Sequence, residues 1–346
     1  MEWQTGDGSH EAERAVQQLS FTKHFLVVMG TVIIFAVFTL IIILLGLGRT
    51  GQPDDVLGST TRYIAFTGIE IAVVLGFQSL LVDKLIDGKK NGASERITDR
   101  ATQFGIRQPR NAKATARDTL LLLFCAIVPL DMISYAIPGV LGYLSSTSVG
   151  SFFNGFTPEL FLTVGLVYNL ITGIKEEFVF RGYFLQRFKE HGSRHTSWIL
   201  TSLLFGILHV DVTVILDYPL GPLVWFVTAF LAGLLFGGYA LNANKFLPLV
   251  LAHGIGNFIS AGAIWTYLTQ GGLSPSALGQ FLLTYYGPMI VAGIVLAILF
   301  NKSIRRAFGA TLRLGRALVH RASGRDSMVV VATIFVLWVL SLFVFY

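Results

Sequence analysis

Long apolar stretches recur along the whole chain of 346 residues and constrain its fold more than any other feature. A helix needs about 20 apolar residues to cross a bilayer whose hydrocarbon core is about 30 Å thick. The stretches cover residues 25–47, 63–82, 119–143, 160–184, 196–210, 221–241, 246–265, 280–300 and 328–346. They predict an all-α, polytopic integral membrane bundle of about nine transmembrane helices, or eight if the short stretch 196–210 does not span.

Composition supports this class. Hydrophobic residues make up 53% of the chain and charged residues 13%, which is typical of an integral membrane protein and excludes an ordinary soluble domain. Cys125 is the single cysteine, so no disulfide framework and no cysteine-based metal site or catalysis is expected. The chain has no Walker or dinucleotide-binding glycine pattern.

Basic residues are concentrated in alternate loops between the apolar stretches. Residues 83–118 hold nine Lys/Arg, 185–197 three, 242–245 one and 301–325 seven. Because cytoplasmic loops carry the excess of Lys and Arg, we predict that the N-terminus and the basic loops are cytoplasmic. The net charge of +6 then reflects topology and contact with anionic lipids, and we expect no nucleic-acid partner.

Charged residues also lie inside one of the apolar stretches. Glu176 and Glu177 follow the apolar run 160–171, and Arg181 comes four residues after Glu177. A charged group at membrane depth costs about 2.5–3.5 kcal/mol even on lenient scales. Residues four apart share a helix face, so Glu177 and Arg181 can pair, whereas Glu176 points about 100° away. The sequence therefore indicates a functional site within the bilayer.

Two further polar pairs occur at helical spacing in later stretches. Phe205 precedes His209 by four residues, and His253 precedes Asn257 by four. At 1.5 Å per residue from the cytoplasmic interface, Glu176 and His209 both lie roughly 16 Å deep, His253 roughly 12 Å and Asn257 roughly 18 Å. Their similar depth predicts that three helices contribute to one site.

The motifs Glu-Glu-x-x-x-Arg, Phe-x-x-x-His and His-x-x-x-Asn, each on its own helix and in that order, resemble the CPBP family. This family comprises CAAX proteases and bacteriocin-processing enzymes and is also called Abi. The resemblance covers residues 160–263 and implies an intramembrane endopeptidase of the CAAX prenyl type. Together with the apolar and charged segments, it leads us to expect a polar tail (1–24), two accessory helices with a basic linker (25–118), a catalytic membrane core (119–300), and a basic loop with a last helix (301–346).

Peptide hydrolysis requires an activated water and a group that polarises the carbonyl. Glu176 is the candidate general base, in the position to which the resemblance assigns catalysis, and His209 would share the water proton. His253 and Asn257 can donate hydrogen bonds to the developing oxyanion, and such donors are worth about 2.7–4 kcal/mol each. The residues expected to support these groups are Glu177, Arg181 and Phe205.

The same residues bear on whether the site needs a metal cofactor. Glu176, His209 and His253 could ligate zinc, because catalytic zinc sites use three such ligands and a water. The strongest zinc-protease pattern, His-Glu-x-x-His, is absent from the chain. We therefore expect hydrolysis without a cofactor, with zinc as the alternative.

The expected partners are membrane lipids and a peptide or protein substrate that reaches the site from the cytoplasmic side. A prenylated CAAX terminus is implied by the resemblance alone. Two other function classes stay open. One is a non-enzymatic immunity or scaffold protein of the same fold, and the other is a proton-coupled carrier that uses Glu176, Glu177 and the histidines as a relay.

Overall fold

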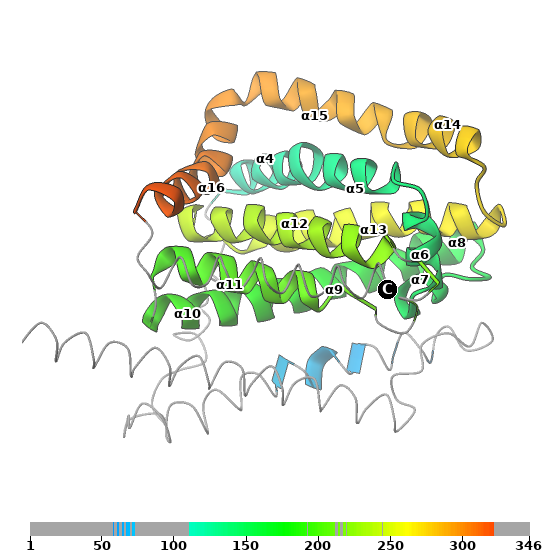
Figure 1. Ribbon diagram of the computed structural model, residues 1–346, viewed down its shortest axis with the longest axis horizontal. Helices are drawn as coiled ribbons and strands as arrows, with labels where there is room; N and C mark the ends of the chain where they lie inside the picture. Colours follow the sequence, from blue (N-terminus) through cyan, green and yellow to red (C-terminus); the bar gives the residue numbers. More distant parts are fainter. Residues whose placement is uncertain are drawn as a thin grey trace, which may run out of the picture.

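The structure is a computed structural model that describes residues 111–191, 193–211, 214, 217–218, 220–243 and 245–321, with scattered positions between 58 and 72. Every regular element of residues 111–321 that it describes is a helix (Figure 1). This confirms the all-α class. The expected stretches 25–47 and 328–346, and most of 63–82, lie outside the described residues.

Most of the described helices follow one another with short connections, apart from residues 208–220, and three of the described segments are π-helical. In order they are α4 (Ala112–Leu122), η3 (Leu123–Ile127), α5 (Val128–Tyr135), α6 (Val140–Ser146), α7 (Ser148–Ser151), α8 (Pro158–Leu160), η4 (Phe161–Gly165), α9 (Leu166–Glu177), η5 (Phe178–Phe184), α10 (Leu185–His191), α11 (Arg194–Ile207), α12 (Gly221–Ala243), α13 (Leu247–Thr269), α14 (Pro275–Tyr285), α15 (Gly287–Leu299) and α16 (Asn301–Arg321).

The long helices lie in layers (Figure 1). Helices α12 and α13 occupy the centre, with α9 packed on α13 and α11 packed on α12. On the opposite side, α4 contacts α13, and α15 contacts η3 as the outermost layer. Helix α16 crosses one end of the layers, and the short helices α6, α7 and α8 gather at the other end. The central position of α12 and α13 brings both of them next to the motif-bearing helices.

Four helical segments in the described part are long and apolar enough to cross a membrane: Ala112–Tyr135, Gly221–Ala243, Leu247–Thr269 and Pro275–Leu299. The chain is thus an integral membrane protein, but the expected count of about nine spans is not confirmed. The predicted span 119–143 is shifted, because the helix breaks after Tyr135 at Pro138 and Gly139, whose φ of 85° is left-handed. Such a φ suits glycine, and a new helix starts at Val140.

The predicted spans 160–184 and 196–210 form helices that do not qualify as apolar spans. Helical residues run without interruption from Pro158 to His191, longer than predicted and with several charges. Helix α11 has 14 residues and is capped at its start by Ser193, whose hydroxyl accepts from the Thr196 amide. At 1.5 Å per residue it is about 21 Å long, shorter than the hydrocarbon core.

Glycines allow the motif-bearing helices to approach their neighbours closely. A Cβ on Gly173 of α9 would lie 2.7 Å from the backbone nitrogen of Gly254 on α13, and a Cβ on Gly254 would lie 2.9 Å from the Cα of Leu170. On α12, a Cβ at Gly233 would lie 3.0 Å from the Cα of Ser202 on α11. Small residues of this kind let the backbones of membrane helices pack directly.

Candidate active site

Glu176 and Glu177 are the last two residues of α9, where the α-helix gives way to the π-helical segment η5. Helix α13 passes α9 at the Gly173–Gly254 contact, and His253 directly precedes Gly254. A π-helical turn inside a longer helix is frequently found at functional sites. The close glycine contact and the π-helical turn together position the two carboxylates against α13.

Glu177 is the most buried of the charged side chains at the site. Its Oε1 accepts from Arg181 Nη1 at 2.8 Å and from His253 Nδ1 at 2.7 Å. The side chain of Glu177 is 0% exposed and that of Arg181 2% exposed. The predicted pair between Glu177 and Arg181 is therefore present. Its extension to His253 on α13 was not predicted, because sequence spacing relates residues only within one helix.

Glu176 faces two imidazoles from different parts of the chain. Its Oε2 lies 3.4 Å from His253 Nε2 and 3.6 Å from His209 Nε2. The Glu176 side chain is 18% exposed and that of His209 is 21% exposed, so this end of the site is more open than the Glu177 end. The structure thus brings together Glu176, His209 and His253, as the depth of the motifs predicted.

His209 does not lie on a helix, contrary to the expectation that each motif occupies its own helix. Helix α11 ends at Ile207, and His209 sits in the turn that follows, with its amide donating to Gly206 O at 3.1 Å. Its Nδ1 lies 2.7 Å from Phe205 O, and a carbonyl can only accept, so Nδ1 carries a proton. In the neutral imidazole the lone pair is then on Nε2, the atom that faces Glu176.

Aromatic rings enclose the cation of the site. The guanidinium carbon of Arg181 lies 4.4 Å from the ring centre of Phe205 and 5.3 Å from that of Phe236 on α12. The same two rings contact His253, at centroid distances of 5.7 and 5.6 Å. A cation held against aromatic faces gains electrostatic energy that grows when water is excluded. Phe205 thus lies against both Arg181 and His253, while its supporting role stays a prediction.

Phe236 is a site residue that the sequence did not reveal. It is 1% exposed and occupies the middle of an apolar helix with several phenylalanines, where nothing distinguishes it from ordinary core. Trp225, also on α12, was missed for the same reason, and its ring centre lies 6.5 Å from that of His209.

Asn257 lies one turn after His253 on α13 and is partly buried. Its side chain makes no hydrogen bond within the residues that the structure describes. The Asn257 amide shares a helix face with His253 and has no hydrogen-bond partner among the described residues. It is therefore available to bind a ligand.

The donor atoms near Glu176 are of the types that zinc prefers. Within the described part of the chain, no group of three or more His, Cys, Asp and Glu side chains forms a recognisable metal site. The reaction scheme below is written without a metal, and zinc stays the alternative that a chelator tests.

Residues 158–259 match the model of a protein family described as type II CAAX prenyl endopeptidase Rce1-like. This match confirms the resemblance to the CAAX proteases. It includes both glutamates, Arg181, His209, His253 and Asn257, which is the part of the chain that forms the site. The match to the family model thus covers helices α8 to α12 and the first part of α13, up to residue 259. Comparisons with curated proteins and with solved structures gave no significant match.

Proposed function

We propose that the protein is an intramembrane endopeptidase in which Glu176 activates a water molecule. The observation that carries the proposal is the convergence of Glu176 Oε2 with the Nε2 atoms of His253 and His209, at 3.4 and 3.6 Å. The family match supports the same reaction class, because the family is one of proteases.

All three of these atoms are hydrogen-bond acceptors, which favours a water bound between them. The Nδ1 atoms of both histidines face acceptors, Glu177 Oε1 and Phe205 O, so each neutral imidazole presents a lone pair toward Glu176. Distances of 3.4 and 3.6 Å are too long for strong direct hydrogen bonds. A water that donates one proton to Glu176 and one to a histidine would satisfy two of these three acceptors. It would also leave its oxygen lone pair free for attack.

The reaction then needs only groups of this chain. Glu176 takes a proton from the water as the water oxygen bonds to the carbonyl carbon, and the carbonyl oxygen becomes an oxyanion. Asn257 Nδ2 donates to that oxyanion. His253 was also expected to donate there, but its Nδ1 faces Glu177 and its Nε2 faces Glu176, so this scheme does not use it as an oxyanion donor. The tetrahedral carbon collapses by breaking the C–N bond, and the protonated Glu176 gives its proton to the leaving amine. His209 orients the water and shares its proton.

Arg181 and Glu177 position these groups without touching the substrate. Glu177 holds His253 by its Nδ1 atom, and Arg181 balances the charge of Glu177 in a site that is almost free of solvent. Burial of the carboxylate without this partner would cost several kcal/mol.

The substrate is a peptide or protein segment, and the printed family description points to a prenylated CAAX terminus as the first candidate. The alternation of basic loops supports an entry from the cytoplasmic side, and membrane lipids surround the bundle. Leu208 is 49% exposed beside His209 and would contact an apolar segment of the substrate there.

The proposal is tested with full-length protein purified in detergent and a fluorogenic farnesylated CAAX peptide. The wild type is expected to cleave the peptide, and the Glu176→Ala and His209→Ala variants are expected to lose cleavage. Cleavage of the unprenylated peptide of the same sequence shows whether the enzyme requires the farnesyl group. Cleavage by Glu176→Ala at the wild-type rate would overturn the assignment of the base.

Two further arms separate the alternatives. Cleavage that survives a chelator supports the glutamate mechanism, whereas loss with chelator and recovery with zinc would replace it with a metal mechanism. Substrate flux into liposomes that depends on a pH gradient, without any cleavage product, would indicate a proton-coupled carrier. Binding of the peptide without turnover in the wild type and in Glu176→Ala would indicate a non-enzymatic scaffold.

A further inference from the structure

Helix α16 carries a stripe of basic side chains that the proposed reaction does not use. The stripe consists of Lys302, Arg305, Arg306, Arg313 and Arg316, all of them exposed. At 100° per residue these five positions fall within an arc of about 100° of the helix surface. We call this set the basic stripe.

The opposite face of α16 is fixed against the bundle. Leu314 is 8% exposed and packs in a cluster with Trp198 and Ile199 of α11, and Phe308 packs against the main core. Thr311 lies directly over Gly238 of α12. Because this face is occupied by the protein itself, the basic stripe points away from the bundle.

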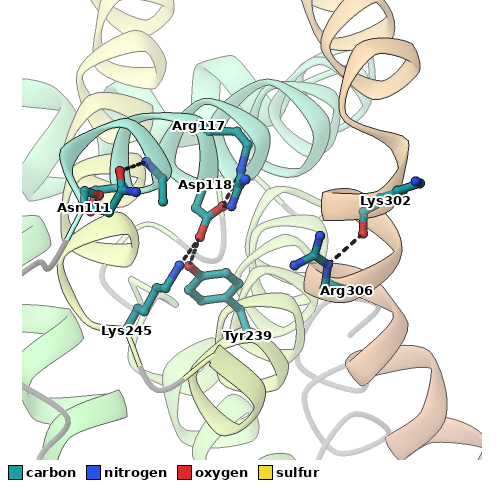
Figure 2. A network of polar contacts seen from close by, with 9 residues as sticks. Asn111, Arg117, Asp118, Tyr239, Lys245, Lys302 and Arg306 are labelled. Atoms are coloured by element: carbon teal, nitrogen blue, oxygen red, sulfur yellow. Dashed lines mark hydrogen bonds and ion pairs between the residues drawn. The ribbon is translucent and has the colours of Figure 1, made fainter.

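Within the described residues, no acidic side chain neutralises the charge of the stripe. Helix α16 contains no acidic residue. Within the described part of the chain, none of the five side chains forms an ion pair. Figure 2 shows Arg306 bonded to the carbonyl oxygen of Lys302, at 3.4 Å, and not to the carboxylate of Asp118. A set of like charges without counter-charges attracts an anionic partner.

The position of α16 places this stripe at the level of the membrane surface. Asn301 follows almost directly on α15, which ends the apolar segment Pro275–Leu299. Leu234 and Leu241 of α12 pack against the cluster that contains Leu314, and Thr311 lies over Gly238. Helix α16 therefore lies beside the second half of a candidate span and not beyond its end. Leu312, 65% exposed at the edge of the stripe, adds an apolar contact suited to lipid.

We propose that the basic stripe of α16 binds the phosphate headgroups of anionic phospholipids. A basic amphipathic helix at the membrane surface is attracted to anionic lipids by about 1 kcal/mol per Lys or Arg. Charge complementarity and continuity with α15 favour lipid over a soluble anion. This inference is independent of the proposed peptidase activity.

The test measures lipid binding to full-length protein in neutral detergent by native mass spectrometry, with phosphatidylglycerol as the anionic probe and phosphatidylcholine as the neutral one. The wild type is expected to bind phosphatidylglycerol more tightly. The Arg313→Gln/Arg316→Gln variant is expected to bind it roughly 25-fold more weakly, which corresponds to about 1 kcal/mol for each charge removed. Phosphatidylcholine binding is expected to stay unchanged.

The matched control is Lys113→Gln/Lys189→Gln, which removes the same charge from exposed positions on α4 and α10. It is expected to keep the wild-type preference, as is Glu176→Ala even if that variant no longer cleaves peptide. Equal phosphatidylglycerol affinity in wild type and Arg313→Gln/Arg316→Gln, or an equal loss in the control, would overturn the proposal. So would displacement of the lipid by glycerol phosphate or by a soluble acidic peptide, which would indicate a soluble partner.

Discussion

Glu176 and Glu177 are neighbours in the chain, yet their carboxylates have separate partners and different exposure. Glu177 is fully buried and accepts from Arg181 and His253, whereas Glu176 is 18% exposed and faces two imidazole nitrogens at 3.4 and 3.6 Å. A rotation of about 100° between adjacent helix positions produces this difference. One carboxylate is suited to hold the site together and the other to contact a reactant.

The pair of Glu177 and Arg181 gives a prediction at this scale. The Arg181→Met variant leaves Glu177 buried without its cation, which we expect to lower the free energy of unfolding by about 3–5 kcal/mol. The Glu177→Gln/Arg181→Met double variant removes both charges and should recover a large part of that loss. Unfolding in detergent, followed by circular dichroism, measures both effects.

In this double-mutant cycle, coupling between the two side chains appears as non-additivity. If the losses of Glu177→Gln and Arg181→Met simply add in the double variant, the two charges do not stabilise each other, and the account of this pair is wrong.

At the scale of helices, the site depends on the approach of α9 to α13. A Cβ on Gly173 would lie 2.7 Å from the Gly254 nitrogen, a distance that real Cβ contacts do not show. We therefore expect Gly173→Ala to separate the two helices, to cost about 1–3 kcal/mol of stability and to lower the cleavage rate by weakening the contact of His253 with Glu177. Thermal unfolding and the cleavage assay measure these two effects.

Gly279 provides a matched control for that substitution. It lies in the interior of α14, and a Cβ there would have no atom within 4 Å. Gly279→Ala should be neutral or stabilising by up to about 1 kcal/mol, since alanine favours the helix. Equal behaviour of the two variants would show that the glycine contact does not matter.

Much of this helix arrangement could be predicted from the sequence, for identifiable reasons. The apolar runs locate α12 and α13 well, because each is long and uncharged. The pairing of Glu177 with Arg181 follows from their spacing alone. By contrast, Phe236 joins the site from the middle of a uniformly apolar helix, where no residue stands out. The π-helical turn after Glu177 is also hidden, since its apolar residues are compatible with an ordinary α-helix.

Whole-molecule features were predicted less completely. The count of spans relied on apolar length, and it counted the charged helix around Glu176 and the short α11 as spans, although neither is a candidate span by length and hydropathy. The end of α11 before His209 was missed because residues 207–210 contain no glycine or proline to mark it. The turn brings His209 to within 3.6 Å of Glu176 on another helix, and local spacing in the sequence does not reveal such a contact.

Asp118 links the layers at the end where α16 crosses the bundle (Figure 2). Its carboxylate accepts from Arg117 at 2.7 Å, from Lys245 at 2.8 Å and from Tyr239 at 3.0 Å. It thereby ties α4 to the end of α12 and to the connection before α13. We expect Asp118→Asn to cost about 1–2 kcal/mol, an amount reduced by the partial exposure of Arg117 and Lys245.

Thermal unfolding in detergent measures this loss, with Lys113→Gln as a control that alters a charge on the same helix without touching the network. An unchanged unfolding temperature for Asp118→Asn would mean that the network does not hold the layers together.

The central claim is that Glu176 is the base that activates water. The most direct measurement is the single-turnover cleavage rate of Glu176→Gln, which keeps the shape of the side chain but cannot take a proton. A general base contributes about 100-fold to 10,000-fold, so the rate should fall by such a factor while peptide binding and the unfolding temperature stay at wild-type values. A Glu176→Gln rate equal to that of the wild type would contradict the claim.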